Sequence, residues 1–211
     1  ESHQYAVLGA GFGIVAAVMT LVCGLLTKER IKPKRAEKFS FTQYSNLITN
    51  KPWIYMTLVA ICTNFFNGFR YAAAGYMITY CLGGDVTVGA LIINYTVFMA
   101  FGEVTCMIFG GLSPAFTRWA GSKRKAFVYS SAICAISSIA YFFIPMDPAY
   151  IWVMVVISII TSIGAGLYSP LIWSMYADVS DYATEKYGTS STGLIFSSGT
   201  MAQKFGGAIS G

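Results

Sequence analysis

Six apolar segments, each long enough to cross a bilayer, fill most of this 211-residue chain. A helix needs about 20 mostly apolar residues to cross the hydrocarbon core, and breaks rich in charge, Gly or Pro separate the segments. Only 11% of the residues are charged, against 55% that are hydrophobic, which favours a membrane protein over a soluble domain. We therefore predict an all-α, polytopic membrane helix bundle with spans near 5–26, 53–82, 88–112, 126–144, 150–176 and 191–211.

Charge alternates between successive loops. Lys and Arg crowd residues 28–51 and 113–125, whereas the breaks around Asp85 and Asp147 contain neither. Because basic loops stay on the cytoplasmic side, we expect loops 28–51, 113–125 and 178–190 to be cytoplasmic in a multi-pass protein of the plasma (inner) membrane. The basic run after the first span would also suit nucleic acid or anionic lipid. Its position between two spans favours topology, so we predict no nucleic-acid partner.

The sequence disfavours catalysis and metal binding. Its five cysteines have no CxxC spacing and lie mostly in apolar segments, and its one histidine is His3. No Cys–His, His–Asp or metal-ligand grouping is visible, so we predict no enzyme, no metal site and no cofactor. The chain starts at Glu1 without a methionine and ends inside an apolar segment, which we interpret as part of a longer protein.

Three charges lie well inside predicted spans: Arg70, Glu103 and Lys204. A cation near the bilayer centre costs about 2.5–3.5 kcal/mol on insertion scales, so it is retained where it faces a partner, a cavity or an ion pathway. Lys204 is the only charge of the last span, and we expect its partner to be Glu103 or a residue outside this chain. Glu103 itself is either a hydrogen-bonded structural acid or a proton-coupling group.

Two spans carry polar stripes. In the second span, Asn64, Asn67 and Arg70 are predicted to line a polar cavity, with Phe65, Phe66 and Phe69 on the opposite face. The alternative is that the two amides only link helices. In the last span, Thr200, Gln203 and Lys204 share one helical face.

Gate residues are suggested near the end of the fifth span. Pro170 follows a run of small residues there and predicts a kink or a flexible gate, with Trp173 one turn further towards the cytoplasm.

A specific pattern runs from the fifth span into the sixth. It comprises an Ala-Asp-x-x-Asp-Tyr sequence, a Lys-x-Gly loop, and a Thr four residues before a Lys with Gly-Gly close behind. The residues are Ala177, Asp178, Asp181, Tyr182, Lys186, Gly188, Thr200, Lys204, Gly206 and Gly207. In this the chain resembles the glycoside–pentoside–hexuronide:cation symporters, the melibiose-permease-like branch of the major facilitator superfamily.

The resemblance covers nearly the whole chain and implies helices six to eleven of twelve. Residues 1–27 would be helix six, 28–51 a basic cytoplasmic interdomain loop, and 52–211 the C-terminal transporter domain without helix twelve. The aspartates that dominate cation coordination in this family belong to the N-terminal half, which would be a partner outside this chain.

The implied function is symport of a sugar or sugar acid with Na⁺ or H⁺. Lys204, Thr200, Asn67, Arg70, Asn64 and Gln203 are the expected substrate and cation residues, and Asp178, Asp181, Trp173 and Glu103 the expected gate or coupling residues. One departure is Ser169, where melibiose permeases place a tryptophan. The alternatives are a lysolipid or amphiphile carrier of the same fold, and a membrane binding or sensor module without transport.

Overall fold

The computed structural model describes residues 2–27, 41–88, 91–188 and 192–211, and the chain divides into two compact units. Unit 1 (Glu1–Ser40) contains the helix α1 (Ser2–Leu26). Every side chain whose exposure is described in α1 is exposed, including large apolar ones such as Phe12 and Leu25. A helix that is apolar all round suits a lipid environment or the interior of a larger bundle.

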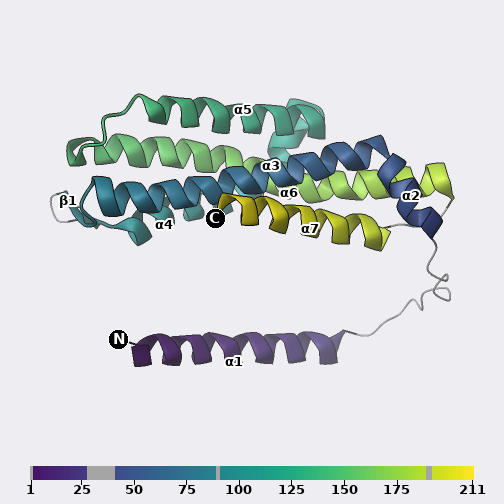
Figure 1. Cartoon of the computed structure of the whole chain (residues 1–211), viewed down its shortest axis with the longest axis horizontal. Helices are drawn as coiled ribbons and strands as arrows, with labels where there is room; N and C mark the ends of the chain where they lie inside the picture. Colours follow the sequence, from purple (N-terminus) through teal and green to yellow (C-terminus); the bar gives the residue numbers. More distant parts are fainter. Residues whose placement is uncertain (1, 28–40, 89–90, 189–191) are drawn as a thin grey trace. The chain divides into compact units, whose positions relative to one another are not determined.

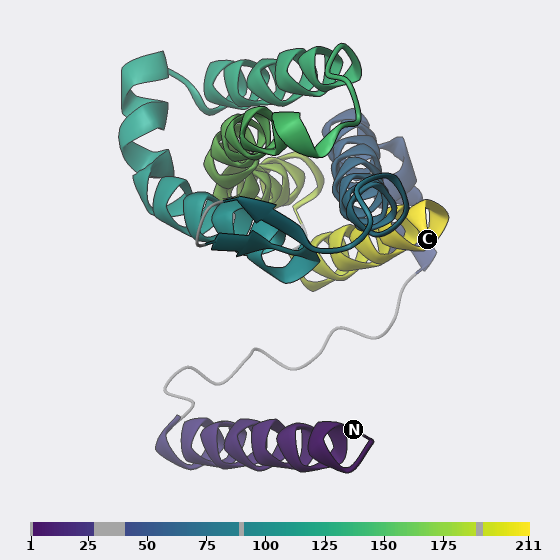
Figure 2. The same cartoon turned by 90° about the vertical axis from the view of Figure 1, so that its left-hand side faces the viewer.

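Unit 2 (Phe41–Gly211) is a bundle built around its longest helix. Figures 1 and 2 show α6 (Ile151–Tyr187) packed among α3 (Lys51–Tyr76), α4 (Tyr95–Ala120), α5 (Lys123–Phe142) and α7 (Thr192–Ser210). The run from Gly164 to Tyr168 is buried at every position, so neighbours contact α6 on all sides at that level. Pro170 lies within α6 without ending it.

Small residues set the spacing between helices. A Cβ atom at Gly166 of α6 would lie 2.5 Å from the carbonyl oxygen of Cys106 in α4, so the two backbones touch there. Gly206 of α7 likewise lies directly against the backbone of Ile61 in α3. Close backbone contact through small residues is the usual way in which membrane helices pack.

Local sequence signals explain where the helices begin and end. Pro52 occupies the first turn of α3, and the side chains of Asn94 and Ser122 accept hydrogen bonds from the first turns of α4 and α5. Gly121 and Gly188 end α4 and α6 with φ values of 78° and 68°, the left-handed conformation that glycine adopts without strain.

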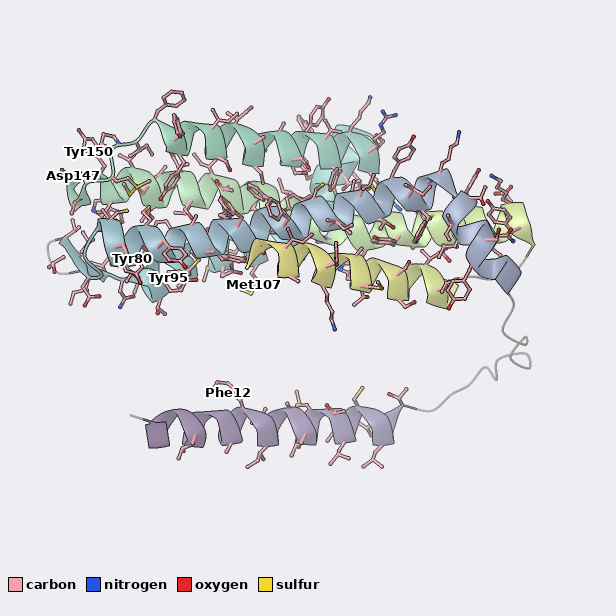
Figure 3. The ribbon with its side chains drawn as sticks, in the orientation of Figure 1. Phe12, Tyr80, Tyr95, Met107, Asp147 and Tyr150 are labelled. Atoms are coloured by element: carbon pink, nitrogen blue, oxygen red, sulfur yellow. The ribbon has the colours of Figure 1, made fainter. Side chains whose placement is uncertain are left out.

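One end of unit 2, which we call the hairpin end, carries the short strands β1 (Val86–Val88) and β2 (Leu91–Ile93). The strands pair antiparallel, with Val86 opposite Ile93, and both of these side chains are buried. The π-helical segment Met77–Cys81 leads into them. Figure 3 labels Tyr80, Tyr95 and Tyr150 near this end, all of them exposed, as interfacial aromatic residues of membrane proteins are.

The opposite end, which we call the α2 end, carries α2 (Phe41–Thr49). Residues 41–49 were predicted as loop but form this helix, whose Leu47 is buried. The predicted loop 178–190 is also largely helical, because α6 continues to Tyr187. Most of the predicted loop 113–125 belongs to α4 and α5. The predicted span 88–112 begins instead with the last residue of β1 and includes β2 before α4 starts. Hydropathy identifies the apolar middle part of a membrane helix. It does not identify the polar ends of the same helix or a short polar helix, so these were assigned to loops.

The membrane-bundle class is confirmed by the predominantly helical fold. Four helical segments of the described chain are long and apolar enough to cross a membrane: Gly9–Leu26, Tyr95–Ala120, Lys123–Phe142 and Pro148–Tyr187. The helices α3 and α7 are not among them, although each is 18 residues or longer. Both carry the polar stripes noted in the sequence, which lower their average hydropathy.

Candidate functional site

Lys204 points away from the body of unit 2. The buried residues of α7 are Ile195, Gly199, Ala202 and Gly206. At 100° per residue, these four positions form one stripe and Lys204 lies almost opposite to it. Lys204 and Thr200 are exposed, and Gln203 is half-buried. Within the part of the chain that the structure describes, Lys204 forms no ion pair.

The packing of α7 is fixed by its neighbours. Gly199 leaves room for the ring of Tyr176, since a Cβ atom there would lie 2.8 Å from that ring. The indole nitrogen of Trp53 in α3 donates a hydrogen bond to Ser198 at 2.8 Å. These contacts hold the stripe inward, so the polar face of α7 is turned outward.

An aromatic pair adjoins this outward polar face. The rings of Trp173 in α6 and Phe196 in α7 are stacked, with centroids 6.2 Å apart and planes 2° from parallel. Trp173 is 40% exposed. The Thr200 hydroxyl donates to the carbonyl oxygen of Phe196 at 3.0 Å and keeps its own oxygen as an acceptor. We call Trp173, Phe196, Thr200, Gln203 and Lys204 the α7 face.

The amides of α3 behave in two ways. Asn64 donates to the carbonyl oxygen of Ala60 in its own helix at 3.0 Å. The amide nitrogen of Asn67 lies 3.1 Å from the Tyr168 hydroxyl in α6, which itself lies 3.3 Å from the amide oxygen. Asn67 therefore links two helices, which is the alternative that the sequence left open.

Arg70 and Glu103 form a second polar group. The guanidinium of Arg70 donates to the Ser162 hydroxyl at 3.2 Å and lies 5.2 Å from the ring centroid of Tyr71. The Tyr71 hydroxyl donates to the carboxylate of Glu103 at 2.7 Å, joining α3 to α4. Glu103 is thus paired with Tyr71 and not with Lys204, so of the two partners expected for Lys204 the one within this chain is not the one formed.

Depth separates the two polar groups. The helices α3 and α7 run parallel, with Gly206 against Ile61. Arg70 lies nine residues beyond Ile61 towards the hairpin end, a rise of about 13 Å. Lys204 lies two residues from Gly206 in the opposite direction. Among the expected substrate and cation residues, those of α7 (Thr200, Gln203 and Lys204) therefore lie at a different level from Arg70 of α3.

The predicted segregation of aromatic and polar residues on α3 is wrong in part. Phe66 and Phe69 line the same apolar pocket as Arg70. Residues four apart lie only 40° apart around a helix, so Phe66 and Arg70 share a face.

The predicted gate aspartates lie at the α2 end. Asp178 is bound within unit 2, because both of its carboxylate oxygens lie 2.7 Å from the Lys123 ammonium at the start of α5. Asp181 is exposed. In the last turn of α6, the Lys186 ammonium lies 5.6 Å from the Tyr182 ring centroid.

Three partners were missed from the sequence: Tyr168, Ser162 and Lys123. Ser162 and Tyr168 lie in the apolar fifth span, where no local pattern distinguishes a bonded hydroxyl from a merely buried one. Lys123 lies in a basic loop, where its charge indicates topology and gives no sign of a particular carboxylate partner. Among the described residues, no group of three or more His, Cys, Asp or Glu side chains is placed to hold a metal ion.

Comparison with known proteins extends over the whole chain. The sequence profile described as MFS/sugar transport protein matches residues 1–211. The chain is 27% identical over 206 residues to the inner membrane symporter YicJ of Escherichia coli K12, covering 96% of this chain and 43% of that protein. It is 26% identical over 203 residues to the putative glycoside/cation symporter YagG of the same organism, covering 94% and 41%. It is also 20% identical over 210 residues to a putative sulfoquinovose importer of that organism, covering 98% and 43%.

No solved structure matches the chain. The chain spans less than half the length of these three curated relatives. They are named as symporters and an importer, as the resemblance to the glycoside–pentoside–hexuronide:cation symporters implies, and the apolar helices agree with an integral multi-pass membrane protein. The chain belongs to the MFS/sugar transport protein family of the major facilitator superfamily.

Proposed function

We propose that this chain forms the C-terminal part of a secondary active symporter that moves a sugar or sugar acid together with Na⁺ or H⁺. The names of its relatives, two symporters and a sulfoquinovose importer, support a sugar-type substrate. Transport would occur by alternating access, with unit 2 rocking against an N-terminal half around a site near the membrane midplane.

The observation that carries this proposal is the orientation of Lys204. An ammonium group in a helix that is otherwise uncharged, turned away from the helices with which α7 packs, would meet lipid unless a cavity or another protein surface covered it. A water-filled path between two halves of a transporter meets that need. Lys204 would then respond to the charge of the coupling cation in the facing half.

The rest of the α7 face is suited to a sugar. Thr200 offers a hydroxyl, Gln203 offers an amide with both donors and acceptors, and Trp173 offers an exposed apolar ring surface. Binding sites for small molecules combine apolar walls with a few such polar groups. The cation would be bound mainly by the N-terminal half, and the Asp178–Lys123 ion pair would hold the α2 end of unit 2 together during rocking.

The test is cation-driven sugar accumulation in vesicles containing the complete transporter that carries this chain. Lys204→Ala should abolish uphill accumulation while leaving the amount of inserted protein unchanged, because Lys204 lies outside the packing of α7. Lys204→Arg should rescue poorly, since a planar guanidinium does not reproduce a compact ammonium.

The matched control is Arg118→Ala, which removes an exposed cation from the last turn of α4. It should leave accumulation unchanged. Normal cation-coupled accumulation by Lys204→Ala would show that Lys204 has no part in coupling and would remove the basis of the proposal.

A further inference from the structure

Unit 2 contains a pocket that is separate from the α7 face. It has a volume of about 470 Å³, within the range typical of small-molecule sites, and lies towards the hairpin end between α3, α4, α5 and α6. Its walls are mainly aromatic and aliphatic, among them Phe66, Met77, Phe98, Tyr141 and Phe142. The Tyr141 hydroxyl lies 3.1 Å from the sulfur of Met77, so this hydroxyl already has a hydrogen-bond partner.

Among the described residues that line this pocket, Arg70 alone is charged. A guanidinium carries five N–H donors, and the described structure places the Ser162 hydroxyl and the Tyr71 side chain against that of Arg70, which leaves donors unused. Arg70 forms no ion pair among the described residues. A half-buried cation with unused donors at an apolar wall favours an anionic oxygen ligand, because charge-assisted bonds are the strongest it makes.

From this combination we propose that the pocket binds a single-chain anionic amphiphile, with its carboxylate or sulfonate at Arg70 and its apolar chain extending towards Met77 and Phe142. A free sugar is a poorer occupant, since most of the wall is aromatic or aliphatic and few of its hydroxyl groups would find a hydrogen-bond partner beyond Arg70, Ser138 and Ser158. The proposal is independent of sugar transport at the α7 face, from which Arg70 is separated in depth.

The probes are decanoate and decanol, which share one alkyl chain and differ in charge. Their binding to the complete transporter that carries this chain would be measured by calorimetry in nanodiscs of zwitterionic lipid. We expect decanoate to bind more tightly, and Arg70→Gln to weaken decanoate binding about tenfold or more while changing decanol binding little. Arg70→Lys should restore part of the loss, because it keeps the charge without the planar fork.

Lys204→Gln is the matched control, because it removes the other intramembrane cation from a helix that does not line the pocket. It should leave decanoate binding unchanged, although it is expected to impair sugar transport, so the two proposals fail separately. Equal binding of decanoate and decanol, or the absence of binding, would overturn the proposal. Displacement of decanoate by phosphatidylglycerol in the nanodisc would also overturn it, in favour of a two-chain lipid.

Discussion

The contact between Gly166 and Cys106 offers the sharpest test of how unit 2 is packed. In Gly166→Ala the added methyl carbon would lie 2.5 Å from the Cys106 carbonyl oxygen and 3.0 Å from its Cα atom. Ordinary contact begins near 3.4 Å, so α4 and α6 must separate by roughly 0.9 Å at this point. The neighbouring atoms belong to backbone, so no side chain can rotate to relieve the overlap.

Gly111→Ala is the matched control. Gly111 lies on α4, and a Cβ atom there would have no neighbour within 4 Å. Both substitutions gain the same intrinsic helix propensity, about 1 kcal/mol at most, so this contribution cancels when the two variants are compared. The remaining difference is the overpacking cost at Gly166, expected to be about 1–3 kcal/mol.

The assay is reversible unfolding of the purified chain in mixed micelles, followed by circular dichroism. Gly166→Ala should unfold at lower denaturant than Gly111→Ala by an amount equal to this difference. The half-buried thiol of Cys106 should also react faster with a maleimide in Gly166→Ala, because the α4–α6 contact is loosened around it. Equal stability of the two variants would refute the close α4–α6 packing.

Two further expectations concern the Tyr71–Glu103 bond and the topology. A double-mutant cycle with Tyr71→Phe and Glu103→Gln should give a coupling energy of about 0.6–1.7 kcal/mol in the unfolding assay, typical of hydrogen bonds between membrane helices. A coupling of zero would mean that the two groups do not bind each other in the membrane. In a background without the native cysteines, single cysteines replacing Arg124 should be labelled only from the cytoplasm, and those replacing Asp85 or Asp147 only from outside. Labelling of position 124 from outside would reverse the predicted orientation.

Much of the fold was predictable because the relevant signals are local. The apolar runs predicted the bundle, and residues such as Asn94, Ser122 and Gly121 determine helix ends through hydrogen bonds or backbone conformations close in sequence. Segments without a strong hydropathy signal were less predictable. Residues 41–49 were predicted as part of a loop because they lie in a polar stretch. In the structure they form α2, whose Leu47 is buried against the bundle.

For the candidate site, the sequence determined which residues are costly to keep in a membrane, since charge and hydropathy can be read without coordinates. It therefore identified Lys204, Arg70 and Glu103. Only the tertiary structure decided their partners, because partnership depends on which helices touch and at what depth. The parallel packing of α3 and α7 places Lys204 and Arg70 at separate levels. Glu103 binds Tyr71 because α3 and α4 meet at these residues. Their spacing along the sequence does not predict that contact.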